Sequence, residues 1–209
     1  MGEYINFART LSRDKVMRGG WAEGLFDAAD RGEISLDTAR LMIFDYATPS
    51  LDTTIASIGE MLWRLASVDG AYDTLRAHPE LVPSVVYESV RMATPIRGFT
   101  RYAIEPFQMS ETTLPAGSRI LLLNASANRD ERHYSDPDRF DVRRNPRDHL
   151  GWGAGVHLCA GMHLARLEME ALLRAILASV ARISAGEPTR LVNNGLQGFA
   201  QLPLTLHPD

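Results

Sequence analysis

The stretch that decides the fold is residues 151–161, which read Gly151-Trp152-Gly153-Ala154-Gly155-Val156-His157-Leu158-Cys159-Ala160-Gly161. Glycines at alternate positions let this backbone adopt conformations closed to other residues and let it approach a flat ligand closely. Cys159 is the only cysteine of the chain and stands just before a predicted amphipathic helix. A thiolate at a helix N-terminus is stabilised by the helix dipole and by free N–H groups, and so makes a good metal ligand.

The N-terminal third of the chain is predicted to be helical. The pattern over residues 8–30 is mostly helical with a break at Gly19-Gly20, and Ser35 is the predicted N-cap of the next helix. That helix, Leu36 to Val68, is about twice the common length and apolar on most sides, which predicts a central buried helix. Pro49 lies inside it, so the helix either kinks and opens there or ends and restarts.

The remaining two thirds mix helices with a small sheet. Alternation of Thr100, Tyr102 and Ile104 predicts a strand, and a second strand follows the turn residues after position 114. We predict helices over 72–78, 82–92 and 162–180, a small sheet within 94–124, an irregular meander over 130–150 and a short β tail after residue 186. The predicted fold class is mainly α with a small β sheet.

Composition excludes several classes of protein. The 209 residues are 45% apolar and 23% charged, with 22 basic and 26 acidic residues and a net charge of −4, which argues against sequence-independent nucleic-acid binding. A single cysteine excludes an internal disulfide. The apolar runs are too short to span a bilayer and the N-terminus lacks a signal-peptide profile, so we expect a cytoplasmic chain without a membrane segment.

The segment from Trp152 to Gly161 resembles the haem-binding loop of the cytochrome P450 monooxygenases, whose pattern is F-G-x-G-x-H/R-x-C-x-G. The resemblance implies that Cys159 is the axial thiolate ligand of the iron of haem b, which favours O–O cleavage. It also implies that His157 binds a haem propionate and that Gly153, Gly155 and Gly161 belong to the cofactor-binding loop.

Two further motifs stand in the order that this family has. Glu88-Ser89-Val90-Arg91 matches E-x-x-R, in which the acid and the base share a helix face. By the same resemblance, Arg139 of Pro137-Asp138-Arg139-Phe140 is the third partner of the cluster of Glu88 and Arg91. Thr100-Arg101-Tyr102 resembles the strand whose arginine binds the other propionate, which a guanidinium suits as a bidentate cation.

A third motif lies on the long helix. Pro49-Ser50-Leu51-Asp52-Thr53-Thr54 stands where the family has A/G-G-x-D/E-T-T/S. The resemblance implies that Asp52 and Thr53 are catalytic, organising water and delivering protons to iron-bound oxygen. Ser50 replaces the usual helix-opening glycine, and Pro49 frees the carbonyl of Asp45 in its place.

The resemblance covers nearly the whole chain but only the C-terminal half of the family's fold. We therefore expect residues 1–209 to be a single partial domain that bears the haem, without the N-terminal half. The implied reaction inserts one atom of O2 into a small organic substrate, with electrons from a ferredoxin or flavodoxin-type donor. Arg143, Arg144 and Arg147 are predicted to form a basic patch for that donor, with Arg139 assigned to the buried cluster.

Two other interpretations stay open from the sequence. In the first, the chain is a non-catalytic truncated fragment that binds haem weakly or not at all, because the protein must enclose the cofactor for useful chemistry. In the second, His149, His157, Cys159 and His163 form a zinc-binding site, since zinc favours these ligand types.

Overall fold

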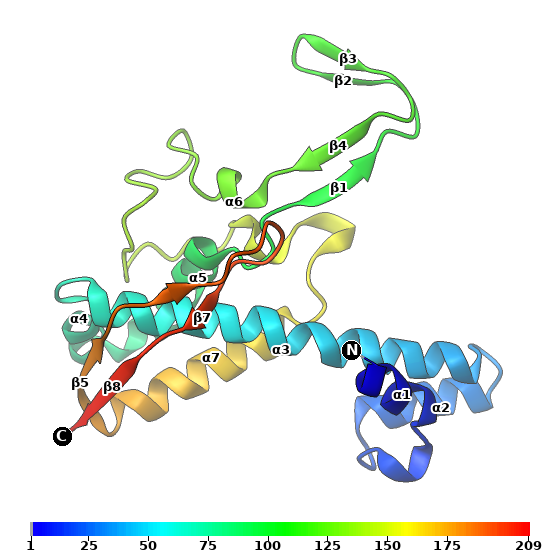
Figure 1. The fold of residues 1–209 in the computed structure, drawn as a ribbon, viewed down its shortest axis with the longest axis horizontal. Helices are drawn as coiled ribbons and strands as arrows, with labels where there is room; N and C mark the ends of the chain where they lie inside the picture. Colours follow the sequence, from blue (N-terminus) through cyan, green and yellow to red (C-terminus); the bar gives the residue numbers. More distant parts are fainter. Residues whose placement is uncertain (1) are drawn as a thin grey trace. The chain divides into compact units, whose positions relative to one another are not determined.

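The computed structural model describes residues 2–209, and these divide into two compact units, one ending at Asp52 and the other beginning at Thr53. The long helix α3, Leu36–Ser67, contributes its first half to one unit and its second half to the other. The first unit also contains α1 (Gly2–Thr10), the 3₁₀ helix η1 (Arg13–Lys15) and α2 (Trp21–Asp30) (Figure 1). The prediction of a single partial domain stays a prediction.

The first unit has a small core of its own. Leu11, Phe26 and Ile43 are buried against one another, and the rings of Trp21 and Tyr46 lie 4.7 Å apart between centroids. The predicted helical stretch over residues 8–30 is wrong in part, because the interruption covers residues 11–20, with only the short η1 helical, and so is longer than the predicted break at Gly19-Gly20. This unit is stabilised mainly by these few apolar contacts.

Helix α3 follows the prediction to within one residue. The N–H of Thr38 donates to the Ser35 hydroxyl at 3.0 Å, which confirms the predicted N-cap. The helix continues through Pro49 rather than ending there. Since proline has no N–H, the carbonyl of Asp45 loses its helical donor, while Ser50 Oγ donates to the carbonyl of Ala47 at 2.6 Å.

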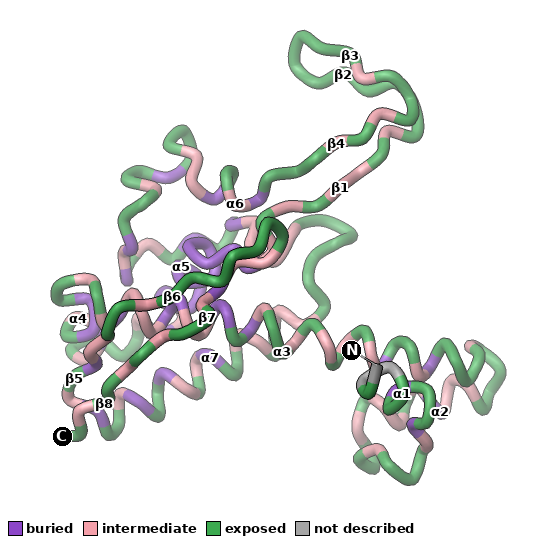
Figure 2. The backbone as a smooth tube through the Cα atoms, in the orientation of Figure 1, coloured by how far each residue is buried: buried purple, intermediate pink, exposed green. Residues whose placement is uncertain are grey.

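The second unit contains the remaining helices and all the strands of the described chain. After α3 come α4 (Ala71–Ala77), the 3₁₀ helix η2 (Pro79–Leu81), α5 (Val82–Ala93) and α6 (Asn124–Ala127). The meander leads to η3 (Leu150–Trp152), η4 (Gly155–His157) and α7 (Met162–Leu177). Helix α5 is buried along almost its whole length, as Figure 2 shows.

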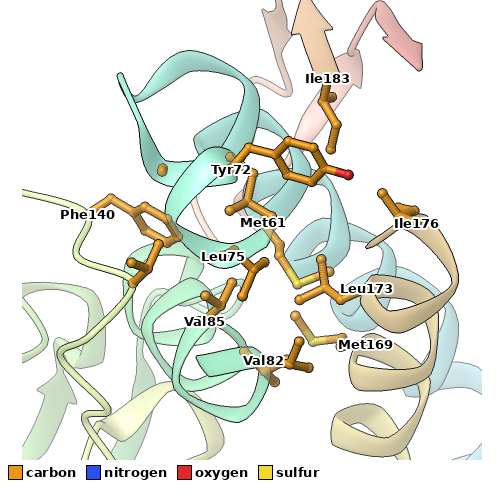
Figure 3. Close-up of a cluster of buried hydrophobic side chains, with 14 of the residues drawn as sticks. Met61, Tyr72, Leu75, Val82, Val85, Phe140, Met169, Leu173, Ile176 and Ile183 are labelled. Atoms are coloured by element: carbon orange, nitrogen blue, oxygen red, sulfur yellow. The ribbon is translucent and has the colours of Figure 1, made fainter. Parts of the chain in front are cut away.

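The core of this unit forms where α5 and α7 pack against the second half of α3 and against α4. Its central side chains are fully buried and interdigitate in Figure 3, namely Met61, Leu75, Val82, Val85, Met169 and Leu173. Phe140 and Val142 of the meander pack on the same cluster. The meander is thus fixed to α5 by apolar contacts although it has no regular secondary structure.

Besides its helices, the second unit contains four two-stranded antiparallel ladders. Strands β1 (Phe99–Tyr102) and β4 (Arg119–Leu122) pair as predicted, with Arg101 opposite Ile120. The other ladders are β2 (Phe107–Met109) with β3 (Thr112–Leu114), β5 (Val180–Ala185) with β8 (Leu204–Pro208), and β6 (Thr189–Arg190) with β7 (Phe199–Gln201). The fold class is confirmed as mainly α with small sheets.

The last helix is shorter than predicted, because residues 178–180 leave it. Helix α7 ends at Leu177, and Val180 starts strand β5 instead. The carbonyl of Val180 accepts hydrogen bonds from the Tyr72 hydroxyl at 2.7 Å and from Arg76 at 2.9 Å. These tertiary contacts outweigh the local helical pattern. None of the helices in residues 2–209 has the length and apolar character needed to cross a membrane.

Candidate functional site

Cys159 lies at the end of a loop that closes on itself. Its N–H donates to the carbonyl of Trp152 at 2.9 Å, and the N–H of Leu158 donates to the carbonyl of Gly155 at 3.1 Å. Gly153 and Gly155 take φ angles of +73° and +62°, in the left-handed region where a side chain is strained. These two backbone hydrogen bonds close the loop, and the Cys159 side chain is exposed.

The surface beside Cys159 is unusually apolar. Val156 is 98% exposed and Leu158 is 48% exposed, and neither has a polar side chain to hold water. His157 is exposed on the same loop. An open thiol flanked by apolar side chains suits a large flat ligand that binds through a metal and covers apolar surface.

The most buried charges of the molecule are Glu88 and Arg91 on α5, both 0% exposed. Arg91 Nε and Nη2 donate to the two carboxylate oxygens of Glu88 at 2.7 and 2.8 Å, a bidentate pair. Arg91 Nη1 also donates to the carbonyls of Asn128 at 2.7 Å and Pro137 at 2.8 Å. These added hydrogen bonds satisfy a guanidinium that burial would otherwise destabilise strongly.

The third member of this cluster is Arg144, which corrects the prediction of Arg139. Arg144 Nε donates to Glu88 Oε1 at 3.1 Å, while the side chain of Arg139 is exposed. Arg139 takes part only through its backbone carbonyl, which accepts from Arg91 and from Arg144 at 3.4 Å each. The meander turns between Arg139 and Arg144. The side chain of Arg139, which is nearer in sequence to Glu88 and Arg91, therefore points to solvent.

Asn128 connects the buried charge pair to the cysteine loop. It is 1% exposed, and its Oδ1 accepts from the N–H of Leu150 at 2.7 Å, at the start of η3. Its Nδ2 donates to the Thr94 hydroxyl at 2.8 Å, which in turn donates to the carbonyl of Arg91. Thr94 ends α5 with a φ angle of +33°, a conformation rare for a β-branched residue that these hydrogen bonds hold.

His149 is buried at the base of the loop and is neutral at pH 7. Its Nδ1 accepts from the N–H of Gly151 at 2.9 Å, which assigns the proton to Nε2. Burial, together with the nearby positive charge of Arg91, lowers the pKa of His149 to about 4. The Nε2 atom is buried and has no hydrogen-bond partner among residues 2–209. His149 thus caps η3 and fills space between aromatic rings.

Other predicted site residues lie on separate elements. Arg101 is half-buried on β1, where its Nη1 donates to the carbonyl of Thr100 at 3.0 Å. Thr53 is half-buried on α3 and its carbonyl accepts from Ser57 Oγ at 2.9 Å, while Asp52 is exposed. Their roles toward Cys159 stay predictions, and so does the role of Gly161, whose missing Cβ would lie 3.8 Å from the sulfur of Cys159.

The zinc interpretation receives no support from the geometry. Across residues 2–209, no three His, Cys, Asp or Glu side chains are grouped so that they could hold a metal ion. His149 is buried with its Nδ1 occupied by Gly151, whereas His157, Cys159 and His163 are exposed. The four predicted ligands therefore do not converge.

The predicted basic patch is smaller than its sequence suggests. Arg143 and Arg147 are exposed, but the side chain of Arg144 is only 13% exposed because it points to Glu88. The exposed positive charge of this segment is partly offset by Asp141 and Asp148. Two arginines, rather than three, are available to an acidic partner.

Taken together, these features define the class of haem-thiolate proteins. The fold is mainly helical, and it presents one exposed cysteine on a glycine loop beside apolar side chains. Gly155 has open space where its Cβ would stand, so a flat ligand can approach the backbone there. The donor set and the loop fit a haem, whose iron takes one thiolate ligand in this class.

Comparisons with known proteins identify the family. The model of the cytochrome P450 family matches residues 30–195. CYP199A2 of Rhodopseudomonas palustris is 36% identical over 202 residues, which are 96% of this chain and 49% of that protein. Cytochrome P450-terp of a Pseudomonas species is 37% identical over 152 residues, or 73% of this chain and 36% of that protein.

Solved structures agree with the sequence relatives. The crystal structure of CYP108D1 from Novosphingobium aromaticivorans superimposes with a TM-score of 0.80 at 32% identity and covers 84% of this chain and 43% of that one. The chain belongs to the cytochrome P450 family, a family of haem-thiolate monooxygenases. It spans about half the length of CYP199A2 and less of P450-terp.

Sequence reasoning did not predict the buried roles of three residues: it assigned Arg144 to the basic patch, His149 to the alternative zinc site and no role to Asn128. Arg144, Asn128 and His149 are polar side chains in the meander and its neighbours, a region without periodicity. The local sequence around Asn128 does not indicate that its side chain is buried, because its hydrogen-bond partners lie 22 and 34 residues away. Their assignment depends on tertiary contacts alone.

Proposed function

We propose that this chain is the haem-bearing part of a bacterial-type cytochrome P450 monooxygenase, in which the thiolate of Cys159 would hold the iron of haem b. The observation that carries the proposal is the exposed Cys159 thiol on a glycine loop that the hydrogen bond from the Cys159 N–H to the carbonyl of Trp152 closes. When bound, the haem supplies the activation of O2 that inserts one oxygen atom into a small organic substrate.

The residues of the loop hold the cofactor in complementary ways. Cys159 provides one negative charge to the iron, and the exposed Val156 and Leu158 exclude water from its neighbourhood. His157 binds one propionate, and Arg101 binds the other through its forked guanidinium. Gly153, Gly155 and Gly161 carry no side chain and would leave room for the haem to approach the backbone.

Proton delivery is assigned to α3. Asp52 is exposed, so its carboxyl exchanges protons with solvent, and Thr53 follows it with a hydroxyl. In this proposal the Asp52 carboxyl would take up a proton from solvent, and the Thr53 hydroxyl would hold a water through which that proton could reach the bound cofactor's site. The helix runs on through Pro49, beside the stretch where the carbonyl of Asp45 lacks its helical donor.

The partners follow from the reaction. It consumes O2 and two electrons, which we assign to a ferredoxin or flavodoxin-type donor that meets the exposed Arg143 and Arg147. We also propose a cytoplasmic location, in keeping with a single free thiol. A complete monooxygenase must enclose the haem. This chain, which matches about half of the length of CYP199A2, carries the part with the cysteine ligand.

Titration of the purified chain with haem tests the proposal. The ferrous–CO complex should show the red-shifted absorption of thiolate-bound haem, and Cys159→Ser should lose it because a hydroxyl is a poor ligand at neutral pH. His163→Gln is the matched control, since this exposed histidine stands close to Cys159 in sequence but is not assigned as a ligand. Persistence of the band in Cys159→Ser would overturn the assignment. Thiolate-bound haem without O2-dependent product would favour the non-catalytic alternative.

A further inference from the structure

The ring of Tyr87 lies where three segments of the second unit meet. Tyr87 is 8% exposed on α5, directly before Glu88. Four side chains surround its ring, and with Tyr87 they are called the Tyr87 cluster: Arg147, His149, Trp152 and Arg166. His149 and Trp152 belong to residues 149–152, which lead into the Cys159 loop and are called the stem of the loop. Arg147 lies just before the stem, and Arg166 follows Cys159 on α7.

Two guanidinium groups approach the Tyr87 ring. The Cζ atom of Arg166 lies 4.9 Å from the ring centroid and that of Arg147 lies 5.7 Å from it. Arg166 Nε is buried and has no hydrogen-bond partner among residues 2–209, and its Nη2 reaches Glu170 only at 3.4 Å. Because the electron-rich ring face attracts a cation, the Tyr87 ring stabilises the half-buried Arg166 together with the ion pair that Arg166 forms with Glu170.

Aromatic contacts continue from Tyr87 toward Cys159. The indole of Trp152 meets the Tyr87 ring edge-on, with centroids 5.5 Å apart and planes at 77°. The carbonyl of the same Trp152 accepts the Cys159 N–H at 2.9 Å. Two contacts thus lead from the α5 ring to the backbone of Cys159.

The stem of the loop packs closely against α5. A Cβ on Gly151 would lie 2.8 Å from Val90 Cγ1, so the backbone at Gly151 is in close contact with the helix. The His149 ring lies 4.8 Å from Trp152 and 6.0 Å from Tyr87. The rings and the helix surface therefore fix the orientation of η3 from two sides.

We propose that Tyr87 is a positioning residue for Cys159, holding both ends of the cysteine loop on α5 through its aromatic ring. The contact with Trp152 fixes the segment before Cys159, and the contact with Arg166 fixes the helix after it. The proposal rests on the proposed function only in assigning Cys159 as the ligand. Each contact given above is made by the aromatic ring of Tyr87. Phenylalanine at this position should therefore preserve the contacts, whereas leucine should lose them.

Hydrogen–deuterium exchange of the haem-free chain tests this directly. In Tyr87→Leu, exchange in peptides that contain Cys159 should be about tenfold faster, since a cation–π contact and an aromatic pair are lost together. Tyr87→Phe should exchange like the parent protein. Tyr72→Leu is the matched control, because it removes the same side chain from the core near Val180 and should leave those peptides unchanged.

Milder variants at two positions keep the test decisive if Tyr87→Leu fails to fold. Arg147→Gln, at an exposed position, should accelerate exchange of the same peptides about threefold. Arg166→Lys, which retains a cation, should have a smaller effect than Arg166→Met. Equal acceleration across all peptides, or equal effects of Tyr87→Phe and Tyr87→Leu, would overturn the proposal. Because no haem is present, a failure of haem binding in the parent protein is a separate result.

Discussion

Glu88 Oε1 lies 3.1 Å from Nε of Arg144, although 56 residues separate them in the chain. The same oxygen accepts from Arg91 Nη2 and from the N–H of Asp141, so one carboxylate joins α5 to two points of the meander. The exposed fraction of Glu88 is 0%, and each of these hydrogen bonds therefore acts in a poorly screened environment. This carboxylate therefore orders the meander on α5 together with the apolar contacts of Phe140 and Val142.

Removing that carboxylate should be severely destabilising. Glu88→Ala leaves the fully buried Arg91 and the nearly buried Arg144 without their anion. Loss of one partner of a buried ion pair costs about 3–5 kcal/mol, which is much of the stability of a domain. We expect a variant that unfolds at far lower urea concentration or is insoluble. Glu80→Ala, at an exposed glutamate, is the control and should melt like the parent protein.

A pair of arginine variants distinguishes the observed third partner from the predicted one. Arg144→Met should destabilise by about 2 kcal/mol, because a charged hydrogen bond to Glu88 is lost. Arg139→Met should have little effect, since only the backbone carbonyl of Arg139 takes part. Urea denaturation of both variants measures the difference. A larger loss in Arg139→Met than in Arg144→Met would contradict the observed geometry.

Stability should fall as the pH drops below about 6.5, in part because of His149. Its pKa is about 4 in the folded chain against 6.5 in the unfolded one. Between these values the unfolded chain binds the extra proton, so the free energy of unfolding decreases as the pH falls. The contribution of this residue is about 3 kcal/mol between pH 7 and pH 4, and it is constant above pH 7. Thermal melts across this pH range measure it.

His149→Asn is the variant that isolates this effect. The asparagine carbonyl can still accept the N–H of Gly151 two residues on, but it does not titrate. The variant should lose the part of the pH dependence between pH 6.5 and pH 4 that His149 contributes. An unchanged pH profile would mean that the pKa of His149 is the same in the folded and the unfolded chain.

Arg143 should affect the approach of an electron donor without affecting the cofactor. The side chain is exposed, and it is not part of the Glu88 cluster. In the haem-loaded protein, Arg143→Glu should slow reduction by an acidic ferredoxin at low salt and flatten the salt dependence, because steering is screened within about 10 Å at 0.1 M. Stopped-flow reduction measures this, and haem content should be unchanged. Equal rates at low ionic strength would place docking elsewhere.

Local sequence determined the elements that have a periodic apolar pattern, a capping residue or a distinctive motif. The N-cap at Ser35, the length of α3, helix α5 and the β1–β4 pair all follow from capping, apolar spacing and alternation. The Cys159 loop was identifiable because glycines in left-handed conformations and a single thiol leave a recognisable string. The acid and base of the Glu88 motif were identifiable because residues three apart share a helix face.

Tertiary structure alone decided which distant groups meet. The choice of Arg144 over Arg139, the burial of Asn128 and the end of α7 at Leu177 each depend on partners more than twenty residues away or on the course of an irregular chain. Both arginines have the same charge and nearly the same reach, so sequence cannot rank them. The backbone path of the meander can, because a buried carboxylate accepts only the guanidinium that the packed chain brings within hydrogen-bond distance.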